Sequence, residues 1–228
     1  MPPVKHQDDA VARSAAARGS LPRVARRLIR LHRDGRALSA RRPDPYRTLV
    51  ACLISLRTKD QVTDAAASRL FARARTPRGL LKLAPRAIET LIYPACFYRV
   101  KARTLRAVSR ELLDRFDGRV PDSIDALLTL PGVGRKTANL VVSQAYGKPG
   151  ICVDTHVHRI SNRLGWVATR DPHGTEEALR RVLPRGLWIP INEILVRHGQ
   201  QICKPISPVC SACPVDDDCP KAGVTRRR

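Results

Sequence analysis

The sequence feature that most constrains this chain is a proline–glycine turn that leads, through two basic residues, into an apolar helix. It reads LPGVGRKTAN over residues 130–139. Pro131 fixes its own φ, while Gly132 and Gly134 accept positive φ or a close backbone approach. We expect helices on both sides, over about residues 122–130 and 135–146. The stretch therefore predicts a helix-hairpin-helix.

Such a hairpin is suited to holding a phosphate. The glycines carry no side chains, so the backbone N–H groups of Gly132, Val133 and Gly134 can point at one phosphate from the start of the second helix. Arg135 adds a positive charge at the same place. We therefore predict that these four residues contact a phosphate backbone.

Lys136 lies in the first turn of the second helix. The positive end of the helix dipole and the neighbouring Arg135 both disfavour a protonated ammonium there, and a neutral lysine amine is a nucleophile. The alternative is a lysine that only contacts phosphate. Asp154 also has two interpretations, because it is either a functional carboxylate or the N-cap of a helix that begins at Thr155.

The charge of the chain indicates a polyanionic partner. Lys and Arg number 42 against 20 Asp and Glu, which gives a formal charge of +22. Nucleic acid is favoured over a membrane, because no apolar run reaches the length of a spanning helix. Aromatic residues make up only 4% of the chain, which argues against a broad stacking platform for single strands.

The N-terminal segment over residues 1–19 is interpreted as a flexible basic tail that adds a contact to DNA. It lacks the apolar core of a secretory signal, although an organellar presequence is an alternative. We therefore expect a cytoplasmic, nucleoid-associated protein.

Helical signals recur along the chain, and no convincing strand alternation is found. Pro77 and Pro85 each stand at the first position of an expected helix, and Thr58 or Asp60 can cap the helix ahead of them. The remaining helices are expected near residues 21–33, 49–54, 99–116, 154–164, 175–183 and 187–199. The fold class is all-α.

Four of the seven cysteines form a short loop near the C-terminus with the pattern C-x6-C-x2-C-x5-C, namely Cys203, Cys210, Cys213 and Cys219. Four thiolates this close together can wrap one compact metal centre, either an iron–sulfur cluster or a single tetrahedral zinc. The spacing alone leaves both open. The other three cysteines, Cys52, Cys96 and Cys152, are interpreted as buried packing residues.

The hairpin, the VDTH stretch at 153–156 and the cysteine loop together resemble the endonuclease III family of DNA glycosylases, from about Tyr46 to Pro220. The resemblance implies two helical domains with a DNA-binding cleft between them. One is a six-helix barrel with the helix-hairpin-helix over residues 45–148, and the other is an iron–sulfur cluster domain from residues 20–44 and 149–228. It also implies that the four cysteines of the loop hold a [4Fe–4S] cluster, and that Lys136 and Asp154 are catalytic.

The activity that this resemblance implies is that of a bifunctional DNA glycosylase and AP lyase of base excision repair. Its partner would be double-stranded DNA with damaged bases or abasic sites, bound by a monomer. The family removes oxidised or ring-saturated pyrimidines after flipping the nucleotide out of the stack. The lysine then forms a Schiff base at C1′, and β-elimination breaks the strand 3′ to the lesion.

Three further residues are expected to contact DNA. Phe97 and Tyr98 lie where the family carries a loop that wedges into the duplex, and core packing is their alternative. Arg57 stands where the family usually has a glutamine that reaches the orphaned base. This departure bears on the preference for the base opposite the lesion, whereas a phosphate contact or a pair with Asp60 would carry no base information.

Two other functions remain possible on the residues alone. One is a monofunctional mismatch glycosylase of the same superfamily, which would lack the lysine at position 136. The other is a DNA-binding protein whose cluster senses redox state and which has lost catalysis. Lys136 argues against the first, and Lys136 with Asp154 argues against the second.

Overall fold

The computed structural model describes residues 20–32 and 42–228. The predicted tail over residues 1–19 lies outside the described residues. No residue of the described ranges belongs to a β-strand, which confirms the all-α fold class. Within these ranges, no helix is both long enough and apolar enough to cross a membrane.

The described residues form two compact units. Residues 42–150 make up the first, here called the central unit, and residues 20–32 with 151–228 make up the second, the terminal unit. The helices of the central unit are α2 (Pro45–Ser55), α3 (Asp60–Arg73), α4 (Pro77–Leu81), α5 (Pro85–Ile92), α6 (Tyr98–Phe116), α7 (Ile124–Leu128), α8 (Arg135–Leu140) and the π-helical η1 (Val141–Ala145). Those of the terminal unit are a helix over residues 20–32, α9 (Thr155–Arg163), α10 (Pro172–Val182), η2 (Arg185–Leu187), α11 (Pro190–Gln201) and η3 (Cys210–Ala212).

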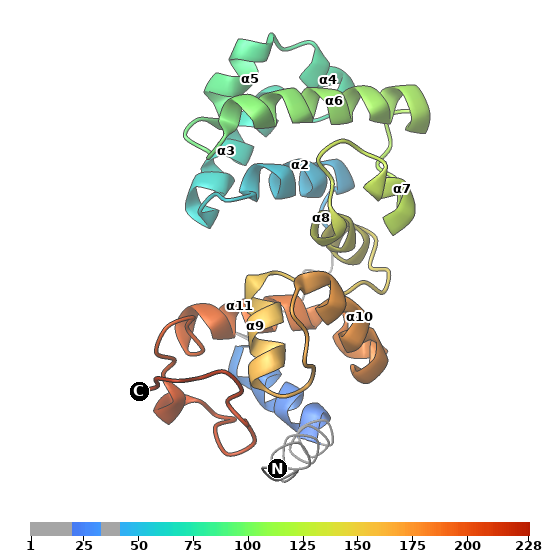
Figure 1. Cartoon of the computed structure of the whole chain (residues 1–228). Helices are drawn as coiled ribbons and strands as arrows, with labels where there is room; N and C mark the ends of the chain where they lie inside the picture. The colour runs from blue at the N-terminus through green and yellow to red at the C-terminus, as the bar shows by residue number, and fades with distance from the viewer. Residues whose placement is uncertain (1–19, 33–41) are drawn as a thin grey trace, which may run out of the picture. The chain divides into compact units, whose positions relative to one another are not determined.

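The core of the central unit is built around α2 and α6 (Figure 1). Leu105, Val108 and Leu112 recur at helical spacing along α6 and are fully buried, so this face packs inward against α4, α5 and α2. On α2 almost every side chain from Tyr46 to Ile54 is buried. An all-round apolar helix of this kind fits the centre of a helical domain.

Local signals set most of the helix starts in this unit. Pro77 and Pro85 stand at the first positions of α4 and α5, as predicted. Asp44 caps α2 by accepting from the Arg47 N–H. The predicted cap of α3 was wrong, because neither Thr58 nor Asp60 serves as one.

The N-cap of α3 is Lys59, which makes no side-chain capping bond. The Thr58 hydroxyl instead accepts from Lys101 Nζ and from the Cys96 N–H.

The core of the terminal unit is formed by the helix over residues 20–32 together with α9, α10 and α11 (Figure 1). Leu21, Val24 and Leu28 are buried at helical spacing, as the sequence predicts. Val215, from the cysteine loop, is also buried in this core. The loop is therefore packed onto the unit by apolar contact as well as by its cysteines.

Candidate functional site

The predicted hairpin is present and joins α7 to α8. Gly132 has φ 74°, and a Cβ there would lie 2.7 Å from Thr104 Cγ2, so the turn requires glycine on both counts. Val133 is buried and anchors the turn in the core, while its N–H donates to the Leu130 carbonyl at 3.2 Å. The conformation of the hairpin is therefore fixed by its packing against the core of the central unit.

Gly134 differs from Gly132 in a way that matters for binding. It is the N-cap of α8, with φ −96°, a backbone that any residue adopts. A Cβ built on it meets no atom of the described chain within 4 Å. Packing within the described residues thus does not explain this glycine, whereas the close approach of an external group to the backbone would.

Lys136 is exposed in the first turn of α8, as predicted, and Arg135 beside it is half-buried. The next residue, Thr137, is buried and receives a contact from the Cys52 thiol at 3.4 Å. The expected helix to about residue 146 continues beyond α8 as the π-helix η1, which packs against α2. Single π-turns within helices often occur near functional sites.

The two candidate wedge residues have different environments. Phe97 is 61% exposed, so the core-packing interpretation is wrong for it. Tyr98 is half-buried at the start of α6, where it packs on the core and meets the Tyr93 ring edge-to-face at 5.4 Å. Of the pair, Phe97 is the side chain available to another molecule.

Arg57 and Phe97 lie together although they are far apart in sequence. The Arg57 guanidinium lies 5.8 Å from the centroid of the Phe97 ring, a cation–π distance. Both residues have positive φ, 55° and 56° respectively. With Gly132 they line one pocket, whose other walls are Leu53, Leu56, Val100, Lys101 and Thr104. The structure thus brings three of the predicted DNA-contacting residues to one place.

Lys101, which the sequence analysis missed, forms one wall of this pocket. Only 7% of it is exposed, and its ammonium donates to the carbonyls of Ile54 (2.6 Å) and Leu56 (2.7 Å) and to the Thr58 hydroxyl (2.8 Å). Burial lowers the pKa of this lysine. The available signal was its position four residues before Leu105, on the apolar face of α6.

Asp154 caps α9 in the terminal unit. Its Oδ1 accepts from the N–H groups of His156 at 2.9 Å and Val157 at 2.8 Å, so the capping interpretation is confirmed. Both of these bonds end on the same carboxylate oxygen. The carboxylate is half-buried and held in one orientation at the start of the helix.

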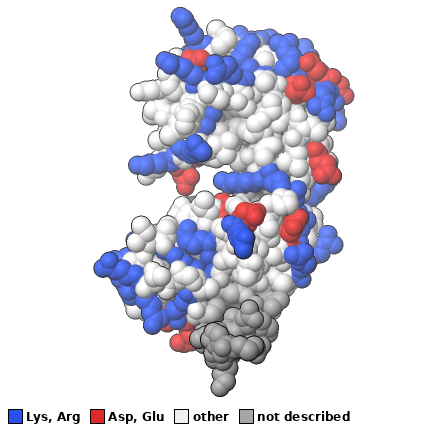
Figure 2. Space-filling model, in the orientation of Figure 1, with Lys and Arg blue, Asp and Glu red and all other residues white. Residues whose placement is uncertain are grey.

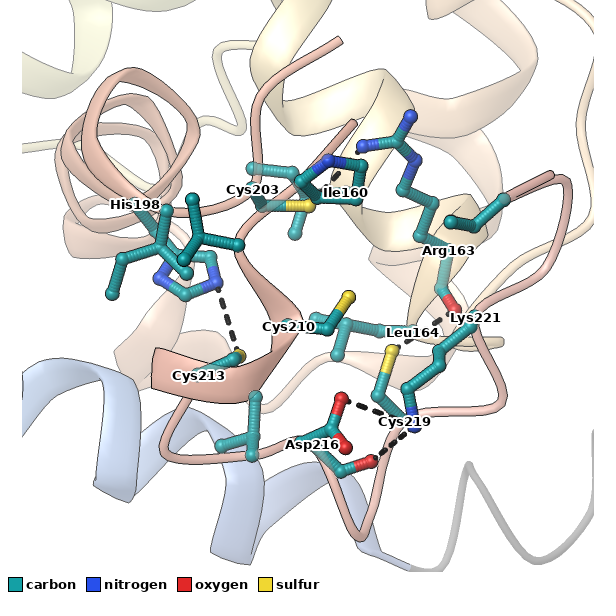
Figure 3. A pocket seen from close by; sticks show the side chains of 15 residues that line it. Ile160, Arg163, Leu164, His198, Cys203, Cys210, Cys213, Asp216, Cys219 and Lys221 are labelled. Atoms are coloured by element: carbon teal, nitrogen blue, oxygen red, sulfur yellow. Dashed lines mark hydrogen bonds and ion pairs between the residues drawn. The ribbon is translucent and has the colours of Figure 1, made fainter. Parts of the chain in front are cut away.

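The four cysteines of the C-terminal loop surround one pocket, whose other walls are mostly apolar (Figure 3). Polar groups reach their sulfur atoms from α9 and α11. Arg163 Nη1 donates to Cys203 Sγ at 3.4 Å, and His198 Nε2 lies 3.7 Å from Cys213 Sγ. Burial raises the pKa of the thiols of Cys210 and Cys213, and that of Cys219 to about 11.

The thiols are spread around the pocket rather than gathered at a point. Among the described residues, no group of three or more His, Cys, Asp or Glu side chains is close enough to hold a metal ion. The loop is attached to the helix over residues 20–32 through Asp218, which pairs with Arg23 and, at 3.1 Å, with Arg27. These pairs attach the loop to that helix from its outer side.

One smaller prediction about single side chains is corrected. Cys52 and Cys152 are buried as expected, but Cys96 is exposed, because it lies in the turn just before Phe97. In the terminal unit, His158 is half-buried, and its Nδ1 lies 2.7 Å from the Thr175 hydroxyl.

Lys and Arg side chains form several separate patches on the visible face of both units, and Asp and Glu cover less of it (Figure 2). The positive charge is therefore not confined to the hairpin. This charge attracts a polyanion without placing it in one position. A defined position would have to come from the local geometry of the hairpin and of the Arg57–Phe97 pocket.

Comparison with known proteins places these features in context. Residues 50–185 match the HhH-GPD superfamily of base excision DNA repair proteins. Endonuclease III of Thermotoga maritima is 50% identical over 176 residues, which cover 77% of this chain and 83% of that protein. Endonuclease III-like protein 1 of Bos taurus is 46% identical over 180 residues, covering 78% of this chain and 59% of the bovine protein.

The fold agrees with these sequence matches. A solved structure of a trapped endonuclease III–DNA covalent intermediate, an estranged-adenine complex, superposes with a TM-score of 0.82. It is 32% identical in sequence, and the match covers 90% of this chain and 96% of the solved one.

Proposed function

Because this chain belongs to the endonuclease III family of base excision DNA repair glycosylases, we propose that it removes oxidised or ring-saturated pyrimidines and cleaves the strand through a Schiff base on Lys136. AP lyase activity is typical of this family. The observation that carries the proposal for this chain is an exposed lysine in the first turn of α8, beside a glycine whose surroundings are open.

The hairpin would position the DNA strand. The backbone N–H groups at Gly132 and Gly134 precede α8, so a phosphate there gains from the helix dipole as well as from hydrogen bonds. The Val133 N–H, predicted as a third donor, already donates to the Leu130 carbonyl. Close approach needs the space that a side chain at Gly134 would fill. Arg135 and the surrounding basic surface add charge without sequence preference.

The damaged nucleotide must leave the base stack before its C1′ atom is accessible. The neutral amine of Lys136 attacks C1′, and the glycosidic bond breaks with its electron pair leaving on the base, which takes up a proton. The nitrogen then gives up one proton to O4′ as the C1′–O4′ bond breaks and the sugar ring opens, which leaves a protonated Schiff base. Loss of a C2′ proton then expels the 3′ phosphate, and water hydrolyses the imine.

Asp154 is proposed to stabilise the positive charge that develops on the sugar and to assist the proton transfers. Its capping role does not conflict with this, because a carboxylate has two oxygens and the two capping bonds use Oδ1. The cap also fixes the orientation of the group, which favours a defined electrostatic role.

Arg57 and Phe97 are proposed to enter the duplex where the nucleotide has left. An exposed aromatic ring can fill the gap between base pairs, and the guanidinium beside it can donate to an orphaned base. Arginine offers donors only, which suit the O6 and N7 acceptors of guanine better than adenine, whose amino group replaces O6. We therefore expect this chain to favour lesions opposite guanine.

A [4Fe–4S] cluster held by Cys203, Cys210, Cys213 and Cys219 is proposed for the terminal unit. In support, these four thiols surround one mostly apolar pocket, the arrangement that a centre of several irons needs (Figure 3). When bound, such a cluster supplies four thiolate–iron bonds that cross-link the loop, together with a redox-active centre. Arg163 and His198 would then contact its sulfur ligands.

The proposal also covers domain organisation and partners. Residues 45–148 are proposed to be the six-helix barrel, and residues 20–44 with 149–228 the iron–sulfur domain. The partner is proposed to be double-stranded DNA that contains damaged bases or abasic sites, bound by a monomeric and nucleoid-associated protein.

An incubation with thymine glycol duplex and with abasic duplex tests the proposal. Wild-type protein and the exposed-lysine control Lys82→Gln should cleave both, whereas Lys136→Gln should bind both and cleave neither. Base release without strand cleavage by the wild type would indicate a monofunctional glycosylase. Binding with neither reaction would indicate a protein that has lost catalysis.

A further inference from the structure

The two residues proposed to enter the duplex share an unusual backbone. Arg57 and Phe97 both have positive φ, a region that residues other than glycine rarely occupy. Such conformations persist only when the surrounding structure imposes them, and they concentrate at functional sites. Contacts around the two turns must impose this backbone, because nothing in the side chains of arginine or phenylalanine favours it.

Lys101 holds the first turn. Its ammonium has three N–H donors, and all three are used by Ile54 O, Leu56 O and the Thr58 hydroxyl, at 2.6, 2.7 and 2.8 Å. Leu56 and Thr58 flank Arg57 on either side. The lysine thus binds the end of α2 and both neighbours of Arg57 at one point, and all three acceptors are uncharged oxygens.

Thr58 connects this turn to the second one. Its hydroxyl accepts from Lys101 Nζ and, at 3.2 Å, from the backbone N–H of Cys96, the residue before Phe97. The same hydroxyl donates to the Leu56 carbonyl at 3.3 Å. One donor and two acceptor positions are the full capacity of a hydroxyl group, so these contacts saturate it. Lys101 itself belongs to α6, which Phe97 caps, and its N–H donates to the Phe97 carbonyl at 3.0 Å.

We propose that Lys101, acting through Thr58, is a positioning residue that fixes Arg57 and Phe97 together as one unit for insertion into duplex DNA. This inference rests on the proposed function, because it assumes that both side chains enter the duplex. Lys101 is a buried residue in the wall of the pocket, and its hydrogen bonds connect the two turns. Without it, each turn can relax from positive φ independently, and the paired geometry of the guanidinium and the ring is lost.

The first test needs no DNA. Hydrogen exchange should be compared between the wild type, Lys101→Met, which keeps an unbranched side chain but no donors, and the surface control Lys82→Met. Segments 55–59 and 95–99 should both exchange faster in Lys101→Met and remain unchanged in the control. Faster exchange in only one segment, or in neither, would overturn the coupling.

The second test uses DNA with and without an opposite strand. Single-turnover cleavage should be measured on a thymine glycol duplex and on a single-stranded abasic oligonucleotide, which has no stack to enter. Lys101→Met should slow duplex cleavage by about ten- to a hundredfold, the scale of a misplaced group, while single-strand cleavage stays within about twofold. Equal slowing on both substrates in a folded variant would overturn the proposal.

A double-mutant cycle separates positioning from general support of the fold. In a protein that already carries Arg57→Gln and Phe97→Ala, adding Lys101→Met should have little further effect on duplex cleavage, because nothing is left to position. A full additional loss would overturn the inference.

Thr58→Val, which removes only the hydroxyl, serves as a milder variant if Lys101→Met does not fold. It should shift the duplex-to-single-strand ratio in the same direction, and an unchanged ratio would refute the link. Absence of duplex cleavage in the wild type would instead refute the proposed function.

Discussion

The two glycines of the hairpin should respond differently to the same substitution. Gly132→Ala places a Cβ on a residue with φ 74° and 2.7 Å from Thr104 Cγ2, whereas Gly134→Ala places one on an unstrained backbone in open space. The first change therefore affects the fold. The second should affect only an approaching ligand.

The magnitude follows from these contacts. Left-handed backbone costs an L-residue about 1–2 kcal/mol, and overpacking against a methyl group adds about 1–3 kcal/mol. Alanine also restricts the unfolded chain, which offsets about 0.4–1 kcal/mol. We expect Gly132→Ala to lower the unfolding free energy by about 1–4 kcal/mol. For Gly134→Ala we expect about 1 kcal/mol or less, because its backbone is unstrained and the main cost is the preference for glycine over alanine at an N-cap.

Thr104→Ser supplies the matched control. It removes the Cγ2 atom, and the other Thr104 atoms lie 3.9 Å from the position of the new Cβ, an ordinary contact distance. In the Gly132→Ala background it should restore the packing part of the loss but not the backbone part.

The assays are denaturant unfolding and fluorescence anisotropy with an abasic duplex. Gly134→Ala should unfold close to the wild type yet bind DNA about tenfold more weakly, which corresponds to about 1.4 kcal/mol. The reasoning fails if Gly134→Ala loses as much stability as Gly132→Ala, or if it binds DNA as well as the wild type. It also fails if Thr104→Ser restores nothing.

Other substitutions test the remaining residues. Asp154→Asn should keep the α9 cap and the stability while slowing base removal more than elimination at a preformed abasic site, and wild-type rates in this variant would leave Asp154 with the capping role alone. Cys210→Ser should remove the broad absorption near about 400 nm that an iron–sulfur protein shows and unfold the C-terminal loop, whereas stoichiometric zinc without iron in wild-type protein would refute the cluster. Arg57→Gln should lose a preference for dihydrouracil opposite guanine, worth about 1–3 kcal/mol, while keeping its rate opposite adenine. Equal loss opposite all four bases would make Arg57 a backbone contact.

Features that depend on local sequence were predicted well. The prolines at 77 and 85 start helices because their φ is fixed and a first-turn N–H has no helical partner to lose. The hairpin follows from Gly132, which alone satisfies the positive φ of its turn. Asp154 caps α9 by accepting from the N–H groups of His156 and Val157, which are two and three residues further along the chain.

Features that depend on contacts between distant segments were missed. Thr58 looked like a helix cap, but its hydroxyl is occupied by Lys101 and by the N–H of Cys96, which lies 38 residues further along. Cys96 is exposed in the turn before Phe97, although cysteine is usually buried. Lys101 was missed because the acceptors that stabilise its burial come from α2 and the turn after it.

The central claim is that the Lys136 amine forms the covalent bond to DNA. Borohydride reduction during reaction with abasic duplex should trap a protein–DNA adduct, and peptide mass mapping should locate the modified sugar on Lys136. Lys136→Gln should give no adduct while still binding the duplex. An adduct on any other residue, or undiminished trapping by Lys136→Gln, would contradict the account.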